Sequence, residues 1–428
     1  MVKKIEQRQK QNDINGGGNN DKISSKDISI VIQGAIDKKC LKNVLICLRS
    51  TRKMLPESEI ILSTWKNTDA EILKIIKTTN EKEKLYDILL LNDDPGAIKS
   101  AFYHGKETKF NNNIFRQILS SREGLKKTTR KYALKMRNDF EMKNTNFLNY
   151  FDKFDDYRMD EMKIFKKRIV VSSIYTCKVF YKNKGVLVQD NCFRFTDWWH
   201  FGLREDVLKL WDIHFENDPC YKGLADDKKD KKVAEKMLVP ANYFHEEQYL
   251  WGNLAKMNDI DFEMIDETDY KLRNAIISEK LLVNNAVVVD FEKSGFTMLK
   301  VARRFSSKEG LYHYYDWLRL YQIYCNENVL IPNYFVSKYE NLFNKAKNAC
   351  FRHAIRINKA VNHCYKTLQG YRKSKHYMLA FVVDNIVMLL KVIYEMLSIG
   401  YYAVKVLFIF VIYLILKKYF SLIDSEKN

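Results

Sequence analysis

Three short apolar runs alternate with helix-like segments in the first hundred residues, and this alternation limits the fold more than any other feature. Residues 28–34, 59–65 and 86–91 have the length and the β-branched content of buried strands. Apolar residues recur at helical spacing over 41–48, and a shorter helix is expected over 69–77. Alternating strands and helices build a parallel sheet, so the sequence predicts a Rossmann-like α/β domain that binds a mononucleotide.

The next predicted strand, Lys131–Asp139, ends in charged residues. Its alternation places Lys135 and Arg137 on the face opposite the apolar side chains. Ligands of α/β domains bind at the carboxyl ends of strands, so Arg137 and Asp139 suit a phosphate–sugar or metal–diphosphate ligand. An ordinary solvated strand end is the alternative. The chain contains neither a G-x-G-x-x-G fingerprint nor a P-loop, so neither of those phosphate sites is supported.

Asp94 and two arginines are further candidates for ligand binding. Asp94 belongs to a turn, Asn92–Gly96, which also lies at the end of a predicted strand and therefore suits a nucleotide-binding loop. Arg116 and Arg122 lie on a helix that closes near Gly124, just before the charged strand. They belong either to a solvated helix face or to a phosphate contact.

Two later segments combine carboxylates with aromatic residues or with a helix start. In Asp197-Trp198-Trp199, an aromatic face can stack on a sugar while the carboxylate binds hydroxyl groups, or the residues form a core cluster with a capping Asp. Glu246 and Glu247 begin a predicted helix, where they either complement the helix dipole or supply a general base. Helical structure is also expected over 144–154, and a strand over 168–175.

Charge and cysteine content narrow the possible partners and the compartment. The formal net charge of +19 at pH 7 favours an anionic partner, namely a membrane surface, a nucleotide or a nucleic acid. None of the eight cysteines forms a C-x-x-C pair or a zinc-ligand pattern, which is typical of free thiols in a reducing cytosol.

The last third of the chain differs from the rest. Residues 276–340 contain a strand candidate, 283–289, and an aromatic helix, 312–324. Residues 341–376 carry six Lys and three Arg with no acidic residue. No aromatic stacking platform interleaves with these cations, so we expect a lipid surface as their partner and no nucleic acid.

Residues 377–420 are very apolar, apart from the charged residues Asp384, Lys391, Glu395 and Lys405. The window Met396–Leu416 has Lys405 near its middle, and a central Lys opposes membrane insertion by ~3 kcal/mol. An in-plane interfacial anchor is therefore expected rather than a span. A hydrophobic helical hairpin packed on the main domain is the alternative.

Eight short motifs, in order over residues 28–275, resemble the WavE lipopolysaccharide synthesis family. They are Ile32-Gln33-Gly34, Glu59-Ile60-Ile61-Leu62-Ser63-Thr64-Trp65, Asp94-Pro95-Gly96, Asn113-x-x-Arg116-Gln117-Ile118, Ser121-Arg122-Glu123-Gly124-Leu125, Leu134-Lys135-Met136-Arg137-Asn138-Asp139, Asp197 with Gly202, and Glu246-Glu247-Gln248-Tyr249-Leu250. The resemblance implies a GT-A-like glycosyltransferase that uses a nucleotide-sugar donor with a divalent metal, Mn²⁺ or Mg²⁺, to build surface polysaccharide.

The resemblance also implies roles for residues that bind the donor. Gln33 and Gly34 would lie at the nucleotide edge of the first strand, and Asp94 would lie near the base or the ribose. Arg116 and Arg122 would approach the diphosphate.

The remaining roles concern the diphosphate, the sugar and the reaction. Asp139 would hold the metal, in the place of an Asp-x-Asp motif whose first Asp is here Arg137, and Arg137 would otherwise offset the diphosphate charge itself. Glu247 is the expected general base, with Glu246 as the alternative. Asp197 would contact the donor sugar or the acceptor, and Trp198 would belong to the donor site.

The sequence thus predicts a GT-A-like domain with a C-terminal helical, membrane-associated region. The expected domains are a disordered tail (1–27), the glycosyltransferase domain (28–275), a mixed accessory region (276–340), a basic segment (341–376) and membrane-associated helices (377–428). The expected protein transfers a hexosyl-type sugar to a lipid-linked or glycan acceptor at the cytoplasmic face of a membrane. A non-catalytic, nucleotide-binding membrane adaptor is the rival hypothesis.

Overall fold

The computed structural model describes residues 23–99, 101–103, 106–109, 111–183, 186–189, 191–269, 271–299 and 310–329, together with 331, 353, 356–357, 392–405, 407–408 and 411. The chain divides into two compact units. One, the α/β unit, comprises Asp13–Val301 and Lys308–Leu330. The other comprises Met1–Asn12, Ala302–Ser307 and Ile331–Asn428.

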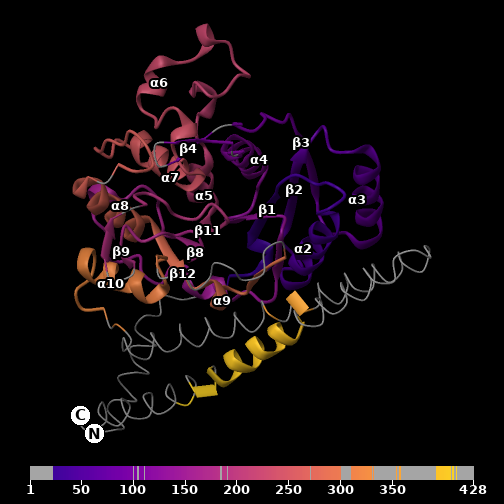
Figure 1. Cartoon of the computed structure of the whole chain (residues 1–428). Coiled ribbons are helices and arrows are strands. Elements are labelled where there is room, and N and C mark those ends of the chain that lie inside the picture. Colours follow the sequence, from indigo (N-terminus) through magenta and orange to yellow (C-terminus); the bar gives the residue numbers. More distant parts are fainter. Residues whose placement is uncertain are drawn as a thin grey trace, which may run out of the picture. The chain divides into compact units, whose positions relative to one another are not determined.

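A seven-stranded, mostly parallel sheet forms the centre of the α/β unit. Among the described residues its order is β12-β8-β11-β6-β1-β2-β3, with β11 antiparallel to both of its neighbours. Figure 1 shows the sheet running from β3, beside α3, to β12, beside α8 and α10. These strands are β1 (Ile28–Gln33), β2 (Glu59–Trp65), β3 (Ile88–Asn92), β6 (Tyr132–Arg137), β8 (Ile169–Ser172), β11 (Trp199–Leu203) and β12 (Ala286–Val289).

Short two-stranded ribbons lie outside this sheet. They are β4 (Ala101–Tyr103) with β5 (Lys106–Thr108), β9 (Phe180–Asn183) with β10 (Val186–Gln189), and β7 (Phe140–Met142) with β13 (Phe296–Met298). The described helices of this unit are α2 (Leu41–Met54), α3 (Ala70–Glu83), α4 (Ile114–Lys126), α5 (Arg204–Trp211), α6 (Lys231–Glu235), α7 (Glu246–Met257), α8 (Leu272–Asn285), α9 (Phe291–Ser294) and α10 (Tyr314–Tyr324).

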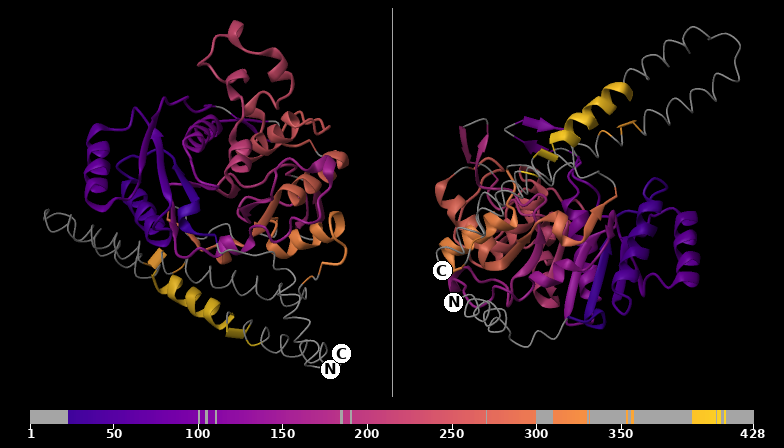
Figure 2. Two further views of the ribbon diagram at one scale, coloured as in Figure 1. Left: turned by 180° about the vertical axis from the view of Figure 1, so that it is seen from behind. Right: turned by 90° about the horizontal axis from the view of Figure 1, so that it is seen from below.

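Helix α4 packs closely on the sheet because Gly124 has no side chain. A Cβ atom at Gly124 would lie 2.4 Å from Cγ1 of Val31. The same close approach lets the Ser63 hydroxyl donate to the main-chain oxygen of Ser120 at 2.8 Å. Both faces of the sheet are covered, so the β1, β2, β6 and β8 strands are buried almost throughout. The α6 segment projects from the rest of the unit (Figures 1 and 2).

The predicted alternation of strands and helices up to residue 139 is confirmed, and so is the helix predicted at 312–324, which the structure places at Tyr314–Tyr324. Two local predictions were wrong. Only a short 3₁₀ helix, Asn146–Tyr150, occupies the expected helix at 144–154. The expected strand at 283–289 is helical to Asn285 and becomes β12 only at Ala286.

Two asparagines explain this second difference. The side chains of Asn284 and Asn285 donate to main-chain oxygens one turn earlier, at 2.8 and 2.9 Å. Asn285 also accepts from the main-chain nitrogen of Ile164 at 2.8 Å. These tertiary contacts hold the helix against the strand preference of the valines that follow. Because β12 then pairs with β8, the α/β unit continues past residue 275 to Leu330.

The described residues of the second unit include a helical stretch at 392–405. Large apolar side chains recur along it with exposed fractions of 44–70%, among them Ile393, Leu397, Tyr401 and Val404. None of the helices in the described part of the chain is both long and apolar enough to cross a membrane. The basic segment 341–376 lies outside the described residues except for 353 and 356–357, and so do 377–391 and 412–428.

Candidate active site

The ends of β1, β2 and β6 align at one edge of the sheet. Gln33, the last residue of β1, pairs in register with Arg137, the last residue of β6, and with Ser63, two residues before the end of β2. The main-chain nitrogen of Asn138 donates a hydrogen bond to the main-chain oxygen of Gln33 at 3.0 Å. Gly34 follows with φ of 138°, and a Cβ there would lie 2.9 Å from Oδ1 of Asn138. Only glycine fits this turn without strain, which places Gln33 and Gly34 at the ligand-binding edge.

A pocket of about 400 Å³ opens at this edge, lined by residues that follow β1 and β2 and by Asp94 and Arg116. Its volume lies within the usual range for small-molecule sites. Arg116 donates two hydrogen bonds to the Asp94 carboxylate, both at 2.7 Å. The same guanidinium lowers the pKa of Asp94. Two residues predicted to contact the donor therefore meet in one pocket.

Arg137 and Asp139 form a second charged pair beyond the end of β6. The guanidinium donates to both carboxylate oxygens, at 3.1 and 2.8 Å, and lies 5.3 Å from the centroid of the Trp198 ring. Burial lowers the pKa of Arg137, but the carboxylates of Asp139 and Asp197 outweigh burial and raise it. Arg137 therefore stays charged, and 28% of its side chain remains exposed.

Three carboxylates gather near this pair: Asp197 and Glu247 are buried, and Glu246 is half-buried. Burial, together with the charges of Asp197 and Glu246 and against the opposing effect of Arg194, raises the pKa of Glu247 to about 8. Arg194 Nε lies 3.5 Å from Oε2 of Glu247. Asp197 is 3% exposed, and its Oδ1 atom is buried without a hydrogen-bond partner among the described residues. Buried acceptors usually have a donor, so this oxygen is free to accept a hydrogen bond from a bound group.

Contacts from helix α7 and the amino end of α4 connect these carboxylates to the pocket lined by Asp94 and Arg116. The Gln248 side chain in the first turn of α7 donates to the Cys192 oxygen at 3.0 Å, which fixes the helix start beside Arg194. Burial raises the pKa of Glu246, while a hydrogen bond from the Asn113 main chain opposes it. Asn113 in turn accepts from Arg116 at 3.1 Å. Asn113 thus connects Glu246 to Arg116, which lines the pocket, although Glu246 and Glu247 are not themselves among the lining residues.

The sequence did not point to Tyr175 and Arg194. The Tyr175 ring lies 5.1 Å from the Trp198 ring, and the charges of Glu247 and Arg194 both act on its hydroxyl. Tyr175 has φ of 59°, a strained conformation for a bulky residue that is common at functional sites. The residues next to Tyr175 in the sequence do not indicate that it belongs to the site, because its contact with Trp198 depends on how the loop after β8 packs against the loop before β11.

Arg122 is not at this site. It donates to the main-chain oxygen of Ile213 at 2.9 Å, forms an ion pair with Glu216, and lies over the Phe215 ring at 5.3 Å. Helix α4 places Arg116 in its first turn at the pocket and Arg122 in its last turns, toward the opposite edge of the sheet. The guanidinium of Arg122 is occupied by internal partners, so we remove it from the donor-binding set.

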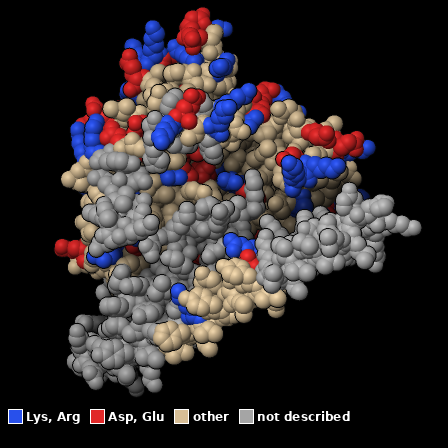
Figure 3. All heavy atoms as spheres, viewed as in Figure 1, with Lys and Arg blue, Asp and Glu red and all other residues tan. Residues whose placement is uncertain are grey.

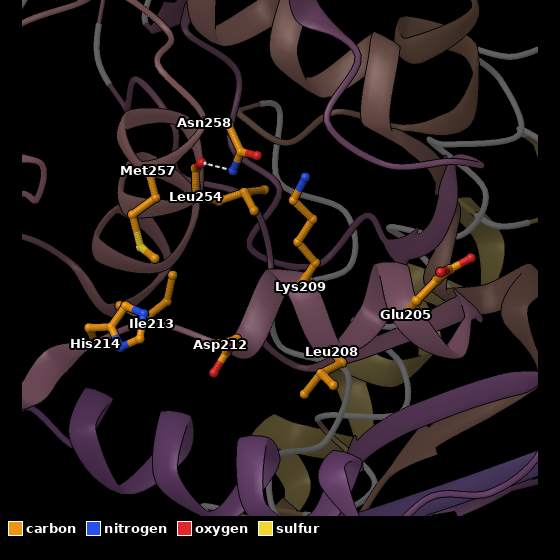
Figure 4. Close-up of a pocket in the computed structure, with 9 residues that line it drawn as sticks. All are labelled: Glu205, Leu208, Lys209, Asp212, Ile213, His214, Leu254, Met257 and Asn258. Carbon is orange, nitrogen blue, oxygen red and sulfur yellow. Dashed lines mark hydrogen bonds between the residues drawn. The ribbon is translucent and has the colours of Figure 1, made fainter. Parts of the chain in front are cut away.

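A second cavity, of about 380 Å³, lies between α5 and the end of α7 and is shown in Figure 4. Its side chains include Lys209, Asp212, His214 and Met257, and none of the residues predicted from the sequence lines it. On the molecular face seen in Figure 3, acidic and basic side chains of the described residues are interspersed, without a large patch of one sign. The carboxylate–arginine site therefore stands out by burial rather than by surface charge.

The residues around Asp139 do not fit a divalent metal in this arrangement. Mg²⁺ sites commonly use one or two carboxylates together with substrate phosphates. Here Asp139 already gives both of its oxygens to Arg137, so a metal would have to displace the guanidinium. Within the described residues, no group of three or more His, Cys, Asp or Glu side chains is placed to hold a metal ion.

Comparisons with known proteins give one clear result. Among solved structures, S. aureus TarS 1–349 matches at 13% identity with a TM-score of 0.23, covering 69% of this chain and 64% of that one. At so low a score the likeness carries no argument. No curated protein matches the chain. The model of the family described as WavE lipopolysaccharide synthesis matches residues 28–348, three quarters of the sequence. The chain belongs to the WavE lipopolysaccharide synthesis family.

Proposed function

We propose that this protein is a glycosyltransferase with a GT-A-like domain, which moves a sugar from a nucleotide-sugar donor to an acceptor in surface-polysaccharide synthesis. The observation that carries the proposal is the gathering of these groups at one edge of the sheet. A nucleotide-sized pocket, an arginine at a strand end and a group of buried carboxylates share one edge of the sheet. Membership of a lipopolysaccharide synthesis family is consistent with this chemistry.

In this proposal the nucleoside occupies the pocket lined by Asp94 and Arg116, and the diphosphate reaches Arg137. Asp139 orients the Arg137 guanidinium, whose charge offsets the negative charge that develops on the leaving diphosphate. The ring of Trp198 lies beside Arg137 and offers an apolar face to the sugar. No step in this scheme depends on a metal.

Glu247 is the proposed general base. Its carboxylate takes the proton of the acceptor hydroxyl as that oxygen attacks the anomeric carbon, and the bond to the diphosphate oxygen breaks with its electron pair. The raised pKa of Glu247 suits this role, because a base that binds a proton near neutral pH accepts one more readily. Asp197, with its unpartnered oxygen, is placed to accept a hydrogen bond from a sugar hydroxyl.

The test is a panel of nucleotide sugars assayed for donor hydrolysis and transfer, with EDTA and with Mn²⁺, on the wild type, Asp139→Ala and Glu247→Gln. Glu81→Gln is the matched control, since Glu81 is exposed on α3. We expect Asp139→Ala to weaken donor binding, and Glu247→Gln to bind the donor normally but react at least tenfold more slowly. Undiminished transfer by Glu247→Gln would remove the base assignment.

The same panel decides between an enzyme and a non-catalytic adaptor. An adaptor would bind a nucleotide in the same pocket and turn over no donor. The wild type is therefore tested for nucleotide binding and for turnover in the same buffer. Binding without turnover across the whole panel would favour the adaptor.

We also propose that the chain acts at the cytoplasmic face of a membrane. The exposed apolar residues at 393, 397, 401 and 404 recur at three- and four-residue spacing, as on one face of an interfacial helix. The basic sequence at 341–376 suits anionic lipid headgroups. Full-length Leu397→Glu should sediment with anionic vesicles less than the wild type does; equal sedimentation would count against the anchor.

A further inference from the structure

Lys135 is a charged residue at the centre of the α/β unit. It is fully buried in β6, two residues before Arg137, and therefore lies on the same face of the strand as Arg137. Its ammonium donates to the main-chain oxygen of Asp197 at 2.5 Å and lies 3.8 Å from the centroid of the Trp211 ring. The family motif, the pocket and the proposed reaction assign it no role.

The segment that Lys135 contacts is held at two successive carbonyl groups. The Thr196 oxygen accepts from Trp251 Nε1 at 3.2 Å and contacts His200 Nε2 at 2.9 Å. Trp211 Nε1 donates to His200 Nδ1 at 3.2 Å, so Nε2 is the nitrogen that carries the proton and donates to Thr196. Three buried side chains thus fix the main chain immediately before Trp198.

This arrangement is unfavourable for stability alone. A buried ammonium pays a desolvation penalty that an apolar residue of similar size does not. Burial lowers the pKa of Lys135 to about 7, and the carboxylates of Asp197 and Asp139 only partly oppose burial, while Arg137 adds to it. Burial and the Lys135 charge also lower the pKa of His200, which keeps the imidazole neutral. Buried ionisable groups with strongly shifted pKa values cluster at functional sites, so Lys135 is a candidate for a functional residue.

We propose that Lys135 is a positioning residue of the active site: by binding the Asp197 carbonyl it fixes the Thr196–Trp198 segment. The segment carries both Asp197, whose Oδ1 atom has no partner among the described residues, and Trp198, which lies beside Arg137. The effect on turnover rests on the proposed function, whereas the effect on the segment does not.

Lys135→Met is the variant that tests this, because methionine keeps most of the volume and removes the charge. Lys131→Met is the control, since Lys131 is exposed just before the same strand. We expect Lys135→Met to melt at the same or a higher temperature and to bind nucleoside diphosphates within threefold of the wild type. Its kcat should fall at least tenfold with little change in the donor KM, and the control should match the wild type.

A crystal structure of Lys135→Met supplies a readout that does not need activity. The proposal expects the Asp197 carbonyl and the Trp198 ring to shift from their wild-type positions. An unmoved segment together with turnover within twofold of the wild type would overturn it. So would an equal loss of stability, nucleotide binding and turnover, because that result would make Lys135 purely structural.

Trp251→Phe tests the same idea if Lys135→Met does not fold. It removes one hydrogen bond to the Thr196 carbonyl and keeps most of the ring packing. Lower kcat with unchanged nucleotide binding supports the positioning role, and unchanged kcat contradicts it. A wild type that turns over no donor would instead refute the proposed function, and the displacement of the segment would still decide the role of Lys135.

Discussion

Replacing Lys135 should change how the stability of the α/β unit depends on pH. Lys135 has its pKa lowered from 10.5 to about 7 in the folded protein. At about 1.4 kcal/mol per pKa unit, this shift corresponds to a penalty of roughly 5 kcal/mol for the charged form. Between pH 7 and 10.5 the unfolded chain binds the proton and the folded chain does not, so the free energy of unfolding rises with pH. The penalty is therefore complete below pH 7 and absent above 10.5.

Lys135→Met removes this penalty together with the hydrogen bond to Asp197. A hydrogen bond from a charged group contributes about 1.5–3 kcal/mol, which leaves a net gain on the order of 2 kcal/mol at pH 6. The gain should shrink by up to about 1.4 kcal/mol for each pH unit above 7 and reverse by pH 9. At pH 6 the variant should thus be more stable, although the proposal above expects it to be less active.

Urea unfolding followed by tryptophan fluorescence measures this difference. The six tryptophans all lie between residues 65 and 317, so the signal reports on the α/β unit. The wild type, Lys135→Met and the Lys131→Met control are compared at each pH from 6 to 9.5. A difference between wild type and Lys135→Met that does not vary with pH would refute the reasoning, because it would show that Lys135 does not titrate in this range.

Three further predictions concern the site itself. Turnover should rise with pH through about 8, because Glu247 must lose its proton to act as a base. Asp197→Asn should move that rise to lower pH, because it removes a charge that raises the pKa of Glu247. An unchanged pH–rate profile in this variant would contradict the assignment. Gly34→Ala should weaken nucleotide binding and lower the free energy of unfolding by about 1–3 kcal/mol, because φ at this position is 138° and the new Cβ would press on Asn138. A nucleotide affinity measured by calorimetry and a melting temperature that both match the wild type would show that the turn does not require glycine. Arg122→Met should lower the melting temperature but leave nucleotide affinity unchanged, because Arg122 bonds to Ile213 and Glu216 rather than lining the pocket; a selective loss of affinity would return Arg122 to the donor site.

The positions of the strands near the site could be predicted from the sequence because each is a short apolar run that ends in polar residues. Arg137 and Asp139 could be placed at a strand end from alternation alone, and the structure puts them there. The burial of Lys135 could not be read in the same way. Alternation gives only the face on which a residue lies, and it does not show that helices and aromatic rings cover that face as well.

Long-range contacts account for what the sequence did not show. Tyr175 and Arg194 join the site through loops whose meeting depends on the antiparallel insertion of β11 between β6 and β8. Arg116 and Arg122 share a helix, but their separation along it sends one to the pocket and the other to Glu216. The apolar run after Asn285 indicated a strand, but the strand begins only after Asn284 and Asn285, whose side chains accept from the main chain of Met159 and Ile164.

The most direct test of the proposed enzyme is a structure of the protein bound to an intact donor analogue. The account predicts the nucleoside in the pocket lined by Asp94 and Arg116, the diphosphate against Arg137, and the sugar between Trp198 and the carboxylates of Asp197 and Glu247. A donor bound away from this edge, or with its sugar far from Glu247, would contradict the account.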